Sequence, residues 1–261
     1  MNLIAGKIFS FLVLIALSVM TVLLIQRMRQ SKEPVDIRRL AGLDALEEVV
    51  GRATETGRPI HYNPGIGSIE SASTGARVLG GMEVLGWLSF QCARYDTRLI
   101  TTHSSPSSYA IAREVVRNGY VQAGKPENFR EESAQFLSSN QMAFAMGAVQ
   151  IMQRENIASN VLIGSYGAEC LLLAEAGNTL GAIQISGDTN AYQLPFLIVT
   201  CDYSLIAEEL FAAGAVLSNN RDVYGSLIAQ DYGKIIALVL LVVGSLMVTF
   251  GNKAIVQLLS W

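Results

Sequence analysis

The sequence predicts an α/β fold, a Rossmann-like and mostly parallel sheet with helices on both faces, flanked by two transmembrane helices. Strand and helix patterns alternate through the middle of the chain, and a long apolar segment stands near each end. The chain has 261 residues, of which 51% are hydrophobic and only 16% are charged, against about 25% charged in an ordinary soluble domain. The expected domains are an N-terminal transmembrane helix at 1–30, a basic juxtamembrane linker at 31–39, an α/β domain at 40–220, a linker at 221–233, and a C-terminal transmembrane helix with an interfacial end at 234–261.

The two apolar segments are 8–25 and 235–250, and only Ser, Thr or Gly interrupts them. Each is long enough to cross a hydrocarbon layer about 30 Å thick when its flanks contribute a turn. A cleaved signal peptide is the alternative for the first segment, but no clear small-residue cleavage site follows the apolar run. The lipid bilayer is therefore an expected partner.

Basic residues near the spans predict the orientation. Lys7 alone precedes the first span, whereas five basic residues follow it: Arg27, Arg29, Lys32, Arg38 and Arg39. Arg221 and Lys234 precede the second span, and Lys253 follows it. Because positive charge resists translocation, we expect a protein of the cell (inner or plasma) membrane with a cytoplasmic central domain and both termini outside.

Alternating patterns predict the elements of the central domain. An apolar stripe of period 3.6 beginning at Leu40 indicates the first helix, and Pro106 suits the first position of another. Gly177 is expected to close a later helix. The expected strands are Pro59–Asn63, Leu99–Thr102, Gln135–Leu137, Asn160–Ile163, Ala182–Ile185 and Phe196–Thr200. The helices between and after them are Ala76–Ala93, Ser105–Asn118, Asn140–Arg154, Ala168–Ala176 and Ser204–Ala215.

This alternation implies a parallel sheet covered on both faces, and it leaves the strand order open. In such sheets the carboxyl ends of the strands face one crevice, where ligands usually sit. The candidate ligand-binding residues at these ends are Asn63, His103, Ser165, Thr189 and Asn190. Small polar residues are also what a strand-to-helix turn needs, so a purely structural role is the alternative.

Motifs for catalysis and for cofactors are missing from the sequence. Residues 164–167 read GSYG rather than G-x-S-x-G, and His61 and His103 both precede Ser165, whereas an α/β-hydrolase places its histidine last. Neither a phosphate-binding loop nor a G-x-G-x-x-G is present. Three scattered cysteines indicate buried thiols rather than a metal site, and a net charge of −3 without a basic field argues against nucleic acid. No catalytic residue, metal or cofactor is expected, and a hydrolase or transferase using Ser165 or His103 is the least favoured function.

Sparse charge in the second half of the domain indicates association. Residues 133–220 contain eight charged residues: Arg154, Glu155, Glu169, Glu175, Asp188, Asp202, Glu208 and Glu209. A surface so poor in charge exposes apolar patches, which usually mark contacts with other chains. The sequence therefore favours a membrane-anchored, self-associating scaffold or structural subunit of a large membrane complex, non-enzymatic and homo-oligomeric. The alternative is a membrane-tethered sensory domain that binds a small polar molecule or a nucleotide.

Three stretches, 40–65, 136–152 and 168–217, together with the closing apolar span, resemble an uncharacterised family of prokaryotic membrane-anchored proteins with an α/β domain. The resemblance covers most of the chain and implies the same architecture. It implies no activity and no catalytic residues.

Overall fold

The computed structural model describes residues 8–30, 41–218 and 221–251. The chain divides into two compact units, one built from both ends and one from Ile37–Asn219. We call the first the helix pair and the second the α/β domain. The predicted linker at 31–39 and the predicted interfacial end beyond residue 251 lie outside the described residues.

The α/β domain is built on one parallel sheet of six strands in the order β3-β2-β1-β4-β5-β6, so the predicted fold class is confirmed. From β1 the chain continues to β2 and β3 on one side of the sheet, and from β4 it continues to β5 and β6 on the other side. The direction of the strand order therefore reverses between β1 and β4. The strands are β1 Ile60–Gly65, β2 Leu99–His103, β3 Ala134–Phe136, β4 Ser159–Ser165, β5 Ile183–Asp188 and β6 Tyr203–Ile206.

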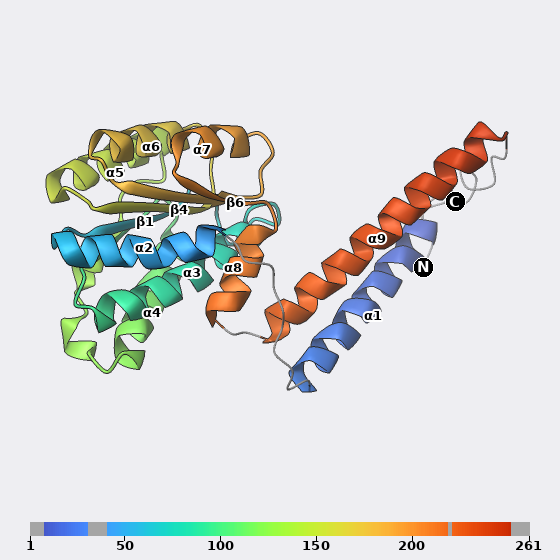
Figure 1. The fold of residues 1–261 in the computed structure, drawn as a ribbon, viewed down its shortest axis with the longest axis horizontal. Coiled ribbons are helices and arrows are strands. Elements are labelled where there is room, and N and C mark those ends of the chain that lie inside the picture. The colour runs from blue at the N-terminus through green and yellow to red at the C-terminus, as the bar shows by residue number, and fades with distance from the viewer. Residues whose placement is uncertain (1–7, 31–40, 219–220, 252–261) are drawn as a thin grey trace. The chain divides into compact units, whose positions relative to one another are not determined.

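Helices cover both faces of the sheet, as expected (Figure 1). The helices on one face are α2 Ala41–Thr56, α3 Gly75–Arg94, α4 Pro106–Gln122 and α8 Glu209–Ser218. Those on the other are α5 Gln141–Glu155, α6 Glu169–Thr179 and α7 Leu194–Thr200. Two short 3₁₀ helices, Pro126–Asn128 and Glu131–Ser133, precede β3. Asn140 caps α5 by accepting from the amides of Met142 and Ala143.

The predicted strand at Phe196–Thr200 is wrong, because these residues belong to helix α7. Pro195 in its first turn has a φ suited to a helix and lacks the amide that a central strand would need. The last strand is instead Tyr203–Ile206, which pairs with β5 where a helix was predicted, and α8 begins only at Glu209. Short apolar runs fit a strand and a buried helix equally well.

Gly177 does not close α6, which continues to Thr179. A Cβ at this position would overlap the Oε1 of Gln184 on β5. The missing side chain therefore allows α6 to approach the sheet closely, and the sequence prediction of a helix end was wrong here.

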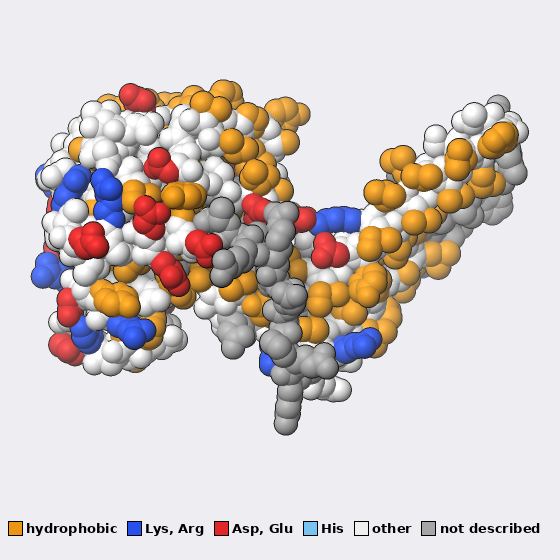
Figure 2. All heavy atoms as spheres, in the orientation of Figure 1, with side chains coloured by type: hydrophobic (Ala, Val, Ile, Leu, Met, Phe, Trp, Pro, Cys, Tyr) orange, Lys and Arg blue, Asp and Glu red, His pale blue; other side chains and the backbone are white. Residues whose placement is uncertain are grey.

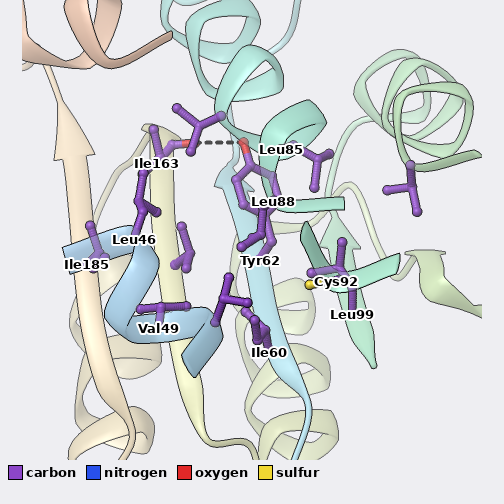
Figure 3. Packing of buried hydrophobic residues seen from close by; sticks show 14 of the residues in the cluster. Leu46, Val49, Ile60, Tyr62, Leu85, Leu88, Cys92, Leu99, Ile163 and Ile185 are labelled. Carbon is purple, nitrogen blue, oxygen red and sulfur yellow. Dashed lines mark hydrogen bonds between the residues drawn. The ribbon is translucent and has the colours of Figure 1, made fainter. Parts of the chain in front are cut away.

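The larger hydrophobic core lies between the sheet and α2, α3, α4 and α8. Figure 3 shows Leu46 and Val49 of α2 and Leu85 and Leu88 of α3 pointing toward the side chains of the central strands. Each fully buried side chain of this size stabilises the fold by about 1.5–3 kcal/mol. A smaller core lies on the other face, under α5, α6 and α7, and its strand residue is Leu162.

A close backbone approach positions α3 on this core. The hydroxyl of Tyr62 donates to the carbonyl oxygen of Ile163, 3.2 Å away (Figure 3). Gly81 of α3 lies directly over this pair, where a Cβ would overlap the Ile163 carbonyl oxygen. Helix α3 is thus held against β1 and β4 by a close backbone approach.

The helix pair consists of α1 Ile8–Gln30 and α9 Arg221–Thr249, and both are long and apolar enough to cross a membrane. The predicted linker at 221–233 is instead the beginning of α9. The helices run side by side in opposite directions (Figure 1), with Gly225 beside Ile25 and Gly233 beside Leu17. A Cβ at Gly225 would lie 2.6 Å from the Cα of Ile25.

Small residues recur at every fourth position of α9, at Gly225, Ala229, Gly233 and Ala237. Such spacing allows two helices to approach closely. Beside this stripe, the Arg29 guanidinium binds both carboxylate oxygens of Asp222, at 2.5 and 2.6 Å. The pair is therefore joined by a close backbone approach at Gly225 and by a bidentate ion pair near the same end.

Candidate ligand site at the carboxyl ends of the strands

The ends of β1 and β4 meet where the two chain directions part, the usual place for a ligand. Here the chain occupies that place itself. The amides of Ile66 and Gly67 donate to the carbonyl oxygen of Ser165, at 3.0 and 3.2 Å. Gly65 has a φ of +78°, and a Cβ there would overlap the same carbonyl oxygen. The glycines of this loop therefore serve packing between two strand ends.

Ser165 and its neighbour Tyr166 lie beneath this loop. Ser165 is 3% exposed, and a Cβ at Gly67 would lie 2.6 Å from the Ser165 Cβ. The hydroxyl of Tyr166 donates to the carbonyl oxygen of Asn63, and burial raises the pKa of this phenol well above its ordinary value. The GSYG segment is thus a tight strand-to-helix turn that ties β4 to β1.

Asp188, at the end of β5, organises the next strand end. Its Oδ1 accepts from the amides of Thr189 and Asn190 at 2.6 and 3.0 Å and from Arg77 Nη1 at 3.0 Å. Its Oδ2 accepts from the amide of Tyr166 at 3.1 Å. One buried carboxylate therefore joins α3, β4 and the loop after β5. Sequence reasoning missed both Asp188 and Arg77, although an aspartate directly before Thr-Asn at a strand end is a recognisable turn signal.

A row of buried polar side chains crosses the sheet on the face covered by α5 and α6, and we call it the polar chain. Its members are Asn63, Thr102, His61, Asn160 and Gln184. Consecutive members are 2.8 to 2.9 Å apart. Gln184 Nε2 then donates to the carbonyl oxygen of Ala174 on α6, at 2.9 Å. Four neighbouring strands and a helix are thereby linked.

The hydrogen-bond roles along the polar chain follow from the amide of Asn160. Asn160 Oδ1 can only accept, so His61 donates from Nδ1 and accepts at Nε2 from the hydroxyl of Thr102. That hydroxyl in turn accepts from Asn63 Nδ2. Burial lowers the pKa of His61 to about 4, opposed by its hydrogen bond to Asn160. His61 is therefore neutral, and both of its ring nitrogens are engaged.

His103 lies on the opposite side of β2 from the polar chain. Its Nε2 is 3.0 Å from Thr101 Oγ1, and its Nδ1 is buried without a hydrogen-bond partner among the described residues. Burial lowers the pKa of His103 to about 3. Neither histidine is hydrogen-bonded to Ser165 in the described part of the chain. The arrangement of base and nucleophile that a serine hydrolase needs is not formed by these side chains.

The amino end of α6 is occupied by its own first-turn carboxylate. Glu169 is buried, and its carboxylate accepts from the amide of Gly167 and, at 2.6 Å, from Gln141 Nε2. An anion at this helix terminus would have to displace Glu169. Glu169 stands in the first turn of α6, so the helix supplies this competing carboxylate itself.

Neither a metal site nor a reactive thiol is evident among the described residues. No group of three His, Cys, Asp or Glu side chains is placed there to hold a metal ion. Cys92, Cys170 and Cys201 are all buried and free. Burial raises the pKa of Cys170 to about 12 and that of Cys201 to about 11. These thiols are therefore protonated at neutral pH and poor nucleophiles.

The five candidate residues thus separate into two groups. Asn63, His103 and Ser165 are buried within the fold, whereas Thr189 and Asn190 are half-buried in the loop after β5. All five stand at or next to strand ends, and ligand binding by them remains a prediction.

Comparison with protein families finds a match to a domain of unknown function (DUF6754) over residues 2–259. The chain belongs to this family. The match covers both helices of the helix pair and the whole α/β domain, so these parts form a single family unit. No curated protein matches the chain, and no solved structure matches it.

Proposed function

We propose that the protein is a membrane-anchored scaffold whose α/β domains self-associate through the outer surface of α5, α6 and α7, which we call the association face. The observation that carries this proposal is the apolar character of that surface. Its exposed large hydrophobic side chains are Met142, Met146, Leu171, Leu172, Phe196, Ile198 and Val199, and Tyr192 stands in the loop before α7. An apolar surface that extends over neighbouring elements marks a contact with another chain.

Charge is scarce on the association face. Figure 2 shows hydrophobic side chains along the edge formed by α6 and α7, whereas Lys, Arg, Asp and Glu gather over α2, α3 and α4. On α5, α6 and α7, the exposed charged side chains are Arg154, near the end of α5, and Glu175 of α6. A face of this kind has little to repel a second copy of itself, which supports a homo-oligomer.

Membrane anchoring is the second part of the proposal. The two apolar helices would hold the domain at the bilayer, and the basic residues in the last turn of α1 and directly after it favour the cytoplasmic side of the inner or plasma membrane, with both termini outside. Tethering in a plane raises the effective concentration of the domains, so weak lateral contacts suffice for assembly. The residues that could act as nucleophiles or bases are buried, namely the three cysteines, the two histidines and Ser165. This burial favours a non-enzymatic role.

The test introduces a charge into the association face. Val199 is 85% exposed on α7, and Val121 is 53% exposed on α4, on the other side of the sheet. We expect the parent protein in mild detergent to be an oligomer at micromolar concentration. Val199→Glu would weaken the association at least tenfold, since an unpaired buried charge at an interface costs about 2–5 kcal/mol.

Val121→Glu is the matched control and should leave the oligomer intact. The mass of each particle is measured by light scattering after size-exclusion chromatography. A parent protein that is monomeric throughout the micromolar range would contradict the proposal. Equal dissociation by both variants would show that the association face is not the contact.

A further inference from the structure

A pocket of about 290 Å³ lies at the amino ends of β2 and β3, at the other end of the sheet from the candidate ligand site. Arg98 and Ser133 line it, and they directly precede these two strands. Cys92, near the end of α3, and Tyr120, near the end of α4, form part of its wall. Small-molecule sites usually measure about 300–1,000 Å³, so the volume of this pocket suits a small ligand.

Two hydroxyl groups in this pocket have no hydrogen-bond partner among the described residues. They belong to Tyr120, which is 5% exposed, and to Ser133, which is 6% exposed. In the described part of the chain, the polar side-chain atoms that are enclosed without a partner belong to Gln91 and His103 instead. Both hydroxyls therefore reach the space of the pocket, where a ligand can bind them. A buried hydroxyl normally finds a partner, so these two groups point to a ligand.

The surroundings of Tyr120 hold its hydroxyl toward the pocket. Its ring meets the ring of Phe129 edge to face, with the centroids 6.2 Å apart. Burial raises the pKa of the Tyr120 phenol to about 12. Smaller electrostatic effects on the phenol come from Cys92, Arg130 and Asp96, all of which line the pocket. The phenol is therefore protonated at neutral pH, and it can donate a hydrogen bond to a ligand in the pocket.

The charged residues of the lining include both signs. Arg98 and Asp96 are each paired with a neighbouring side chain, at 2.6 and 2.7 Å. Glu127 is exposed and forms no ion pair among the described residues. The guanidinium of Arg130 lies 3.9 Å from the Glu132 carboxylate, and both side chains are about two-thirds exposed, so this contact is weak. One carboxylate and one guanidinium thus remain for a ligand that carries both charges.

We propose that this pocket binds a free α-amino acid. The ligand carboxylate accepts hydrogen bonds from Arg130 and from the hydroxyls of Tyr120 and Ser133, and the ligand ammonium group donates to Glu127. A simple anion would meet Glu127 without compensation, and a simple cation would meet Arg130 in the same way, so the lining favours a zwitterion over either. The site is independent of the proposed scaffold function, because none of these residues belongs to the association face.

The sample is the full chain in mild detergent, and the probes are the common protein amino acids, each titrated separately in a calorimeter. We expect at least one of them to bind saturably at a single site. Its N-acetyl derivative lacks the ammonium group and its amide lacks the carboxylate, so each should bind at least about tenfold more weakly.

Variants of the lining test the residues. Tyr120→Phe should weaken binding about three- to tenfold, as for the loss of one hydrogen bond, and Arg130→Gln should weaken it at least about tenfold. Tyr120→Phe should not lower the free energy of unfolding in urea, because the hydroxyl that it removes has no partner among the described residues. A purely structural role of this hydroxyl would give the opposite pattern.

Tyr95→Phe and Arg117→Gln are the matched controls, since they make the same chemical changes at exposed side chains outside the pocket lining. We expect each of them to change the affinity less than about twofold. The proposal is overturned if none of the amino acids binds saturably, or if the N-acetyl derivative or the amide binds as tightly as the amino acid itself. Equal weakening by a control and by its partner in the lining would show that binding takes place elsewhere.

Discussion

Replacing Asn160 by leucine would interrupt the polar chain between His61 and Gln184. Asn160 Oδ1 accepts from His61 Nδ1, and Asn160 Nδ2 donates to Gln184 Oε1, each at 2.8 Å. Leucine has the same branched shape and the same number of heavy atoms as asparagine, so Asn160→Leu leaves no large cavity, but it removes both polar partners at once. The His61 N–H and the Gln184 carbonyl oxygen would stay in the interior without a hydrogen bond.

The expected loss of stability follows from these two groups. Both side chains are fully buried, and a buried group without its partner costs about 1–3 kcal/mol. Asn160→Leu should therefore destabilise the α/β domain by about 2–6 kcal/mol, a large part of the 5–15 kcal/mol typical of a folded domain. Asn178→Leu is the matched control, because Asn178 is exposed and its partner Gln184 Nε2 keeps the carbonyl oxygens of Ala174 and Thr200. We expect this control to cost less than about 1 kcal/mol.

Urea unfolding of the full chain in mild detergent measures both variants, with Trp87 as the reporter in the Trp261→Phe background. Linear extrapolation gives the free energy of unfolding in water. If Asn160→Leu proves as stable as the parent, or no less stable than Asn178→Leu, the polar chain does not contribute to the fold in the way its geometry indicates.

Three further predictions use the same unfolding measurement or a cross-linking assay. Because burial lowers the pKa of His61 to about 4 and of His103 to about 3, the unfolded chain binds protons first as the pH falls below 6.5. The free energy of unfolding should then drop by about 2 kcal/mol per histidine between pH 7 and pH 5, and these groups should change it little above pH 7. An equal free energy of unfolding at pH 7 and pH 5 would contradict this prediction. Gly65→Ala should destabilise the domain by more than 2 kcal/mol, since the new Cβ overlaps the end of β4, whereas Gly57→Ala, with a positive φ but open space, should cost only about 1–2 kcal/mol of backbone strain. Gly225→Leu should separate α9 from α1, seen as a lower yield of a disulfide engineered between the two helices, and an unchanged yield would argue against their close approach.

The sequence alone determined the features that depend on neighbouring residues. Periodicity placed five of the six strands, and Pro106 occupies the predicted first position of α4. The apolar segments correspond to two helices long enough to span a membrane. The prediction also located Asn63, His103 and Ser165 at strand ends, because polar residues after an apolar run mark that position whatever the strand order.

Only the tertiary structure decided which of these residues are available to a ligand. His61 pairs with Asn160, and the loop after β1 packs against the end of β4, so residues about a hundred positions apart satisfy one another's hydrogen bonds. The same holds for α7 and β6, where Pro195 and the pairing of Tyr203–Ile206 with β5 outweigh the apolar run at Phe196–Thr200. Local patterns record the preference of a segment, but hydrogen bonding and burial are satisfied between segments, and the free energy of those contacts exceeds the small differences in local propensity.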